Sequence, residues 1–294
     1  MTALAAARLG KEIAFSDEEF SRLAHLAHSE FGITLTTAKK PLVYSRLTKR
    51  LTACDLADFS SYITFVENTQ NAEERSELVS ALTTNVTSFF REAHHFDTVK
   101  SVLLPRLKSV PEKRRIRFWS AGCSSGPEPY SLAMTVLDAW PELAQRDFKI
   151  LATDIDQKIV STAREGVYDE DVAKSIPTDK RKKWTAPDAA RPDHASMKPE
   201  LRCHIHFGEL NLVKAWPMSG PFDAIFCRNV AIYFETATQQ VLWKRFTDLL
   251  APGGFLFIGH SERVSGPALD DLQVAGVTTY QKTESPGDKK GSPA

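Results

Sequence analysis

The pattern that most constrains this chain begins after Arg115, where short apolar runs alternate with stretches of helical periodicity. The runs suited to strands lie at 116–121, 148–154, 222–227 and 254–259, and helical patterns follow at 128–140, 157–165 and 236–250. Parallel strands need long crossover connections, which such helices supply. This alternation therefore predicts a doubly wound α/β domain built on a parallel sheet.

The first ninety or so residues have helical periodicity and no convincing strand. Ser16 and Glu19 form a capping box that opens a first helix, and Gly32 stands where its C-terminal cap belongs. Further helical patterns start near Pro41 and recur farther on, at 57–67, 72–84 and about 96–109. We therefore expect a helical N-terminal domain at 1–90, followed by the α/β domain at 91–284.

The stretch 170–207 interrupts the alternation of strands and helices. It is polar and contains prolines, and its last part, 201–207, alternates between apolar and polar residues as a strand does. We expect an inserted small antiparallel β subdomain there and a terminal β-hairpin at 272–282. The tail at 285–294 is rich in Pro, Gly and Lys, which predicts disorder.

The overall composition excludes several classes of protein. Lys and Arg number 37, as do Asp and Glu, and a dedicated nucleic-acid binder usually has a large positive excess. No run approaches the roughly 20 apolar residues of a membrane span, and the N-terminus lacks the features of a signal peptide. The four cysteines are scattered, as in intracellular enzymes. We expect a cytoplasmic monomer that binds no nucleic acid and does not insert into membranes.

The spacing of residues argues against two further chemistries, a metal site and phosphate transfer by a P-loop. In an alternating strand, His204 and His206 share one face and Cys203 takes the other, so three metal ligands would not converge there. We therefore expect no metal site. The sequence also lacks the GxxxxGK[ST] loop, which argues against P-loop kinases and ATPases.

Two predicted strand ends favour a nucleoside-containing cofactor. The loop WSAGCSSG at 119–126 closes the first strand and leads into a helix, and its small residues allow the backbone to approach a ligand closely. Asp154 ends the second strand, where an acidic side chain accepts hydrogen bonds from ribose hydroxyls. A tight turn with no ligand remains an alternative for the glycine loop alone.

Four strings together resemble the CheR family of chemoreceptor methyltransferases. They are LTTNVTSFFREAHHF at 82–96, WSAGCSSGPEPYS at 119–131, FDAIFCRNVAIYF at 222–234 and PGGFLFIGHSE at 252–262. Their order and spacing are similar too, over about 16–283. The resemblance implies a Rossmann-like S-adenosylmethionine (SAM)-dependent methyltransferase domain with a helical N-terminal domain and a small antiparallel β insertion. It also implies SAM as cofactor, S-adenosylhomocysteine as product, and glutamate side chains on a chemoreceptor's cytoplasmic helices as substrate.

Carried over position by position, the resemblance implies a set of cofactor-binding residues. They are Asn85, Thr87, Arg91, Gly122, Glu128, Asp154, Asn211, Leu212, Arg228 and Asn229. Arg91 would pair with the carboxylate of the methionine part, Glu128 would hold the amino group or ribose, and Asp154 the ribose. Asn211 and Leu212 lie where the family contacts adenine. Pro127 departs from the family, because many relatives have a glutamate there.

The implied reaction needs alignment more than proton transfer. The sulfonium methyl group is already activated, and a glutamate carboxylate is ionised near pH 7. No general base is required, which agrees with the absence of a recognisable catalytic triad. We predict that Arg91 and Tyr233 are the catalytic residues, with Arg91 anchoring the cofactor and Tyr233 orienting the methyl group or the substrate.

The segment 39–51 carries five basic residues and no acid. A solvated helix face explains this pattern, but a basic helix would also steer glutamate-rich receptor helices. Arg46, Lys49 and Arg50 are therefore candidates for substrate docking. The loop 186–195 lacks the glycines expected for binding a receptor's C-terminal peptide, which favours tether-independent binding. Another methyltransferase substrate such as RNA, and a SAM-sensing module acting on another partner, remain alternatives.

Overall fold

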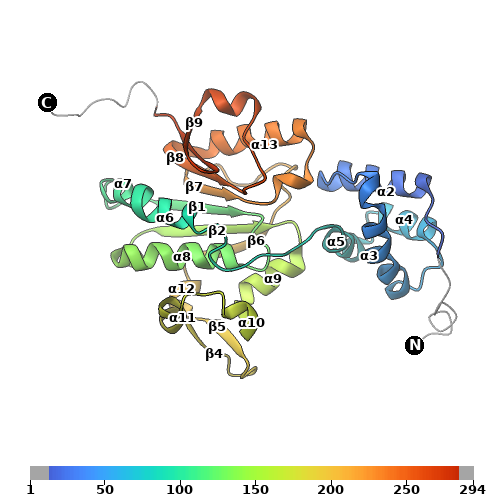
Figure 1. The fold of residues 1–294 in the computed structure, drawn as a ribbon, viewed down its shortest axis with the longest axis horizontal. Helices are drawn as coiled ribbons and strands as arrows, with labels where there is room; N and C mark the ends of the chain where they lie inside the picture. The colour runs from blue at the N-terminus through green and yellow to red at the C-terminus, as the bar shows by residue number, and fades with distance from the viewer. Residues whose placement is uncertain (1–12, 285–294) are drawn as a thin grey trace. The chain divides into compact units, whose positions relative to one another are not determined.

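A computed structural model describes residues 13–284 of the chain, so the expected disorder of 285–294 lies outside the described residues. The chain forms two compact units (Figure 1). The helical unit comprises the described residues through Thr84 together with Tyr233–Glu235, and the α/β unit comprises Asn85–Ile232 and the described residues from Thr236 onward. No helix within 13–284 is long and apolar enough to cross a membrane.

The helical unit is built from amphipathic helices around their own apolar core. Its elements are α2 (Asp17–Phe31), η1 (Thr37–Lys39), α3 (Lys40–Ala53), α4 (Phe59–Glu67) and α5 (Ala72–Leu82). The capping box of Ser16 and Glu19 is confirmed, and Gly32 ends α2 in the left-handed conformation with φ of 73°. Leu23, Leu47 and Ile63 are fully buried in the shared core. The expectation of a helical N-terminal domain is confirmed.

The α/β unit is organised by a seven-stranded sheet with the order β6-β2-β1-β7-β8-β10-β9. The strands are β1 (Ile116–Ala121), β2 (Phe148–Asp154), β6 (Ile205–Glu209), β7 (Phe222–Cys227), β8 (Leu250–Ile258), β9 (Leu272–Gly276) and β10 (Thr279–Lys282). The strands from β6 to β8 pair in parallel, and the β9–β10 hairpin joins β8 antiparallel. Every residue of β7 is buried, as expected for a central parallel strand covered on both faces.

The connecting helices cover the two faces of this sheet (Figure 1). They are α6 (His94–Thr98), η2 (Val99–Leu103), α7 (Leu104–Lys108), α8 (Pro127–Ala139), η3 (Pro141–Gln145), α9 (Gln157–Glu165), η4 (Ala231–Tyr233), α13 (Thr236–Leu249) and η5 (Gly266–Asp270). The strand order runs outward from β1 to β2 and in the opposite direction from β7 to β8. Right-handed crossovers then put α8 and α13 on opposite faces. The order reverses between β1 and β7, and this is where open α/β sheets bind ligands.

The small antiparallel sheet has the order β3-β5-β4 and is inserted between α9 and β6. Its elements are β3 (Val167–Asp169), α10 (Glu170–Ala173), α11 (Thr178–Trp184), β4 (Thr185–Pro187) and β5 (His194–Met197), and α12 (Pro199–Arg202) follows. This confirms an antiparallel β insertion. The last strand expected within it is placed differently, because 205–209 pairs in parallel with β2 as an edge of the main sheet. Its alternation reflects an edge strand with Ile205 and Phe207 buried and His206 exposed.

Candidate cofactor site

The predicted cofactor residues gather at the carboxyl ends of three adjacent parallel strands. Gly122 follows β1, Asp154 ends β2 and Arg228 follows β7. The strand order reverses between β1 and β7, and this edge is where open α/β sheets bind ligands. The topology thus brings together residues that are about a hundred positions apart in the chain.

The loop after β1 requires glycine at Gly122. Its φ is 84°, and its backbone N–H donates to the Thr153 carbonyl at 2.7 Å. A Cβ atom here would lie 2.2 Å from Cγ2 of Val230, so any side chain would collide with the turn that follows β7. Gly126 caps α8 with φ of 100°, a conformation that side chains rarely adopt. The two glycines therefore allow the loop to turn tightly at the end of β1 and to enter α8.

Asp154 is fixed by the backbone on both sides of it. Its Oδ2 accepts from the Ser124 N–H at 2.8 Å, and its Oδ1 accepts from the Asp156 N–H at 3.1 Å. Burial raises the pKa of Asp154, while these backbone donors oppose the rise. The carboxylate is therefore rigid, and it lies beside the glycine loop as a ribose-binding acid would.

Asn85 joins the segment before Arg91 to the same strand ends. Its side-chain Nδ2 donates to Asp156 Oδ2 at 3.2 Å, and its carbonyl accepts from Ser124 Oγ at 3.1 Å. Thr87 is half-buried in the same segment, and Arg91 donates to the Val86 carbonyl at 3.2 Å. The structure thereby connects Asn85 with the loop of Asp154.

A charged cluster connects three of the predicted cofactor residues. The Arg228 side chain is 3% exposed, and its Nη1 donates to Glu128 Oε2 at 2.9 Å. Its Nη2 donates to the Arg91 carbonyl and lies 3.5 Å from Glu92 Oε2. Glu128 also accepts from Ser120 Oγ at 2.7 Å. Arg228 is thus a buried bridge between α8 and the Arg91 segment.

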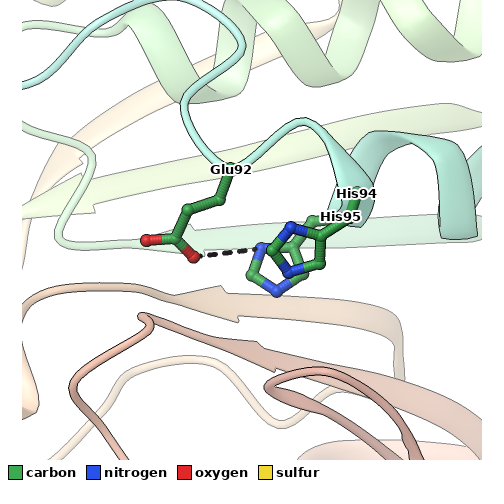
Figure 2. A group of neighbouring side chains, drawn as sticks. All are labelled: Glu92, His94 and His95. Atoms are coloured by element: carbon green, nitrogen blue, oxygen red, sulfur yellow. Dashed lines mark ion pairs between the residues drawn. The ribbon is translucent and has the colours of Figure 1, made fainter.

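Glu92, His94 and His95 lie next to this bridge with potential metal-ligand atoms within 4.8 Å of one another (Figure 2). Glu92 Oε2 is 3.7 Å from His95 Nδ1, the pair marked in Figure 2. Burial, together with the charge of Arg228, lowers the pKa of His95 to about 3, so its ring is neutral. The Glu92 carboxylate already faces the Arg228 guanidinium, whose charge opposes a cation. We assign no metal to this group.

The remaining predicted cofactor residues follow β6 and β7. Leu210 N–H donates to the Asp154 carbonyl at 2.8 Å, which brings Asn211 and the buried Leu212 next to the end of β2. Asn229 has φ of 61° and begins the turn after β7. Both segments therefore reach the same edge of the sheet as Gly122.

Tyr233 and the three docking candidates belong to the helical unit. Tyr233 Oη accepts from the Thr84 N–H at 3.3 Å, and Arg46 donates to the Thr83 carbonyl at 2.9 Å. Arg50 is paired with Glu74, whereas Lys49 is exposed and has no partner within 13–284. The guanidinium groups of Arg46 and Arg50 therefore serve the fold, and Lys49 is the candidate whose charge faces solvent.

The sequence reasoning did not single out four side chains that organise the site: Glu92, Ser120, Asp156 and Glu262. Two of them, Glu92 and Asp156, lie within two positions of Arg91 and Asp154 and could have been found as further acids near these residues. The alternation expected for Cys203, His204 and His206 is wrong, because α12 ends just before this point and His204 is buried while His206 is exposed. The regular alternation starts only at Ile205.

Comparison with known proteins identifies the family. Residues 85–281 match the SAM-binding domain of the CheR methyltransferases, and residues 18–83 match their all-α domain. The chain belongs to the CheR methyltransferase family. A probable chemotaxis protein methyltransferase of Rhizobium etli is 45% identical over 88% of this chain and 97% of its own length. The chemotaxis protein methyltransferases of Salmonella typhimurium and Escherichia coli are 38% and 39% identical, over 93% and 88% of this chain and the same shares of their own.

As a CheR family member, the chain is a SAM-dependent methyltransferase, and the residues at the strand ends fit this cofactor. Gly122 allows the β1 loop to turn tightly beside the strand ends, and Asp154 offers a fixed carboxylate for hydroxyl groups. The Nε of Arg228 and the Oε2 of Glu92 are buried without a hydrogen-bond partner in the described residues. A zwitterionic amino-acid group bound nearby would complement such atoms.

Proposed function

We propose that this chain transfers the methyl group of SAM to glutamate side chains on the cytoplasmic helices of a chemoreceptor, forming methyl esters in chemosensory adaptation. The observation that supports this most is the convergence of Gly122, Asp154 and the Arg228–Glu128 pair at the point where the strand order reverses. Family relatives named as chemotaxis protein methyltransferases support the choice of substrate. We also propose that the reaction takes place in the cytoplasm, where these receptor helices lie.

The proposed cofactor contacts follow the strands. Asp154 would accept from the ribose hydroxyls, and Asn211 with Leu212 would border the adenine beyond the end of β6. Glu128 would receive the amino group of the methionine part while Arg228 keeps the Glu128 carboxylate in place. Arg91 would pair with the methionine carboxylate, and Arg228 orients the Arg91 segment through its carbonyl. Asn85, Thr87 and Asn229 would complete the contacts.

The protein's part in the reaction is alignment. SAM supplies an activated methyl group, and the ionised glutamate oxygen is the nucleophile, so no side chain has to remove a proton. We propose that Arg91 fixes the cofactor and that Tyr233 orients the methyl group or the incoming carboxylate. Correct placement of the reacting atoms accounts for a large part of the acceleration in such reactions.

We propose that the receptor helix is attracted by the basic surface of α3. Among the three candidates, Lys49 has the exposed charge that steering requires, while Arg46 and Arg50 support the helix from within the unit. We further propose that the protein acts as a monomer and binds its receptor without a C-terminal tether.

The deciding experiment is transfer of radiolabelled methyl from SAM to purified receptor cytoplasmic fragments. Label released as methanol by mild base identifies glutamate methyl esters. Arg91→Ala and Tyr233→Phe should each reduce the rate, with Arg91→Ala also weakening SAM binding measured by calorimetry. If the wild type binds SAM but labels no receptor, the function is instead SAM sensing or methylation of another substrate. Full turnover by both variants would disprove the two catalytic assignments.

A further inference from the structure

Glu262 follows the end of β8 and accepts hydrogen bonds from four backbone N–H groups. Its Oε2 accepts from Gly259 at 2.6 Å and from Asn229 at 2.9 Å. Its Oε1 accepts from Val230 at 2.9 Å and from Ile232 at 3.3 Å. Three of these donors belong to the turn after β7, and none of the proposed cofactor contacts uses this carboxylate.

The turn that Glu262 holds leads from the end of β7 into η4, where Gln239 Nε2 donates to the Ala231 carbonyl at 2.9 Å. Asn229 adopts the left-handed conformation with φ of 61°, which breaks the strand ladder directly after Arg228. A Cβ atom on Gly259 would lie 2.6 Å from Asn229 Nδ2 and 2.7 Å from its backbone nitrogen, so β8 ends directly against this residue. Without an acceptor at Glu262, these N–H groups would lose their partners.

The same turn reaches the cofactor loop through Val230. The Cγ2 atom of Val230 fills the space where a side chain on Gly122 would stand. Glu262 fixes the Val230 backbone, Val230 packs on Gly122, and Gly122 forms the loop that follows β1. The turn of residues 229–232 therefore supports the loop that follows β1, at the point where the strand order reverses.

We propose that Glu262 is a positioning residue for SAM binding: it holds the turn of residues 229–232 so that Asn229 faces the cofactor and Val230 supports the Gly122 loop. This inference rests on the proposed function. Because both carboxylate oxygens are occupied by backbone donors, Glu262 does not act as a general base. Glu262 therefore affects the affinity for SAM indirectly.

The test is Glu262→Gln, which keeps the shape of the side chain. In either orientation the amide NH₂ faces two backbone N–H groups, so one pair of hydrogen bonds is replaced by contact between donors. We expect S-adenosylhomocysteine affinity, measured by calorimetry, to fall about tenfold. The circular dichroism spectrum and the helical content should be retained. Unchanged affinity would overturn the proposal.

A control variant separates positioning from general loss of stability. Leu143→Ala removes a buried side chain in η3, at the opposite edge of the sheet, and should lower the melting temperature without weakening cofactor binding. If Leu143→Ala weakens binding as much as Glu262→Gln, Glu262 has only a structural role. A wild type that binds no S-adenosylhomocysteine would instead overturn the proposed function, and this inference with it.

A double-mutant cycle gives the decisive measurement. If Glu262 acts through the placement of Asn229, Glu262→Gln should cost much less affinity in an Asn229→Ala background than in the wild type. Equal losses in the two backgrounds would show that Glu262 does not act through Asn229. A carboxylate with a purely structural role would give additive losses of affinity, so the cycle distinguishes that role from positioning.

Discussion

Each unit contains an arginine that is paired with glutamate, and the two clusters differ in how fully their polar atoms are hydrogen-bonded. In the helical unit, Arg50 Nε and Nη2 meet the two oxygens of Glu74 at 3.0 and 2.6 Å, and Tyr62 Oη adds a bond to the same carboxylate at 2.8 Å. In the α/β unit, Arg228 is shared between Glu128 and Glu92, at 2.9 and 3.5 Å.

We infer from this difference that the first cluster is structural and that the second belongs to the proposed cofactor site. The Arg50–Glu74 pair uses both oxygens in a bidentate contact, which is the geometry of a self-sufficient pair. Around Arg228, three buried atoms find no hydrogen-bond partner in the described residues: Arg228 Nε, Glu92 Oε2 and His95 Nδ1. Buried polar atoms are rarely left in this state, so the second cluster is suited to completion by a ligand.

Replacing Arg228 should have the largest effect. Arg228→Met leaves Glu128 and Glu92 without their cation and frees the Arg91 carbonyl. We expect methyl transfer to fall about a thousandfold or more, and unfolding free energy to fall by about 3–5 kcal/mol, as for other broken buried pairs. Urea unfolding measures the unfolding free energy, and the radiolabel assay measures methyl transfer. Adding Glu128→Gln to Arg228→Met should restore part of the stability but no activity. Methyl transfer by Arg228→Met within tenfold of wild type would show that the Arg228 bridge is not needed for the reaction.

The two clusters should also differ in their response to acid. Burial and Arg228 lower the pKa of His95 to about 3 from the ordinary 6.5. The unfolded chain then binds a proton that the folded chain does not, so stability falls as pH falls from 6.5 towards 3, by on the order of 4 kcal/mol in total. Burial raises the pKa of Glu74, but Arg50 and Tyr62 outweigh this effect and hold it below the ordinary 4.5. The contribution of Glu74 to stability is therefore fully present above pH 4.5 and is lost only as pH falls below that value.

Tryptophan fluorescence can follow the first of these transitions separately. All five tryptophans lie in the α/β unit: Trp119, Trp140, Trp184, Trp216 and Trp243. Urea unfolding followed by this signal should lose stability between pH 6.5 and 5, and His95→Asn should flatten that dependence. A wild-type midpoint that does not change over this range would contradict the buried neutral histidine.

Breaking the helical cluster should affect stability alone. Glu74→Gln removes the charge that Arg50 and Tyr62 share, and we expect a loss of about 2–3 kcal/mol in unfolding free energy. SAM affinity should remain within twofold of wild type, because this cluster is self-sufficient. Calorimetry measures the SAM affinity, and urea unfolding measures the unfolding free energy. A large loss of SAM affinity would show that the two clusters are coupled and do not have separate roles.

The sequence predicted the parts of this molecule that local chemistry determines. The strands at 116–121, 148–154 and 222–227 have the expected bounds because buried parallel strands are nearly continuous apolar runs. Edge strand β6 was assigned to the wrong sheet, since alternation shows that a strand is half-buried but not which strand it joins. The insertion therefore ends earlier than its polarity suggested.

Prediction of the site from the sequence was limited in the same way. Gly122 and Asp154 could be proposed from the sequence because glycines and acids at strand ends have a known local meaning. Arg228 was predicted only through the family resemblance and Glu262 was not predicted. Their contacts with Glu128 and Asn229 join residues that are far apart in the sequence, and no local pattern reveals such a contact. Likewise, the charge pattern of α3 could not show that Arg46 and Arg50 bond within their own unit.

The smallest expected effect concerns Lys49, and it tests whether the helical unit does more than support its own fold. Lys49→Ala removes an exposed charge that has no partner among residues 13–284, so unfolding free energy should change by less than about 0.5 kcal/mol. If α3 steers the acidic receptor, the KM for receptor should rise about threefold and depend less on salt, with SAM affinity and kcat unchanged. Arg46→Ala is the contrast, because it removes donors to the Thr83 and Ala81 carbonyls and should lower stability instead. An unchanged KM for Lys49→Ala would mean that another surface recruits the receptor.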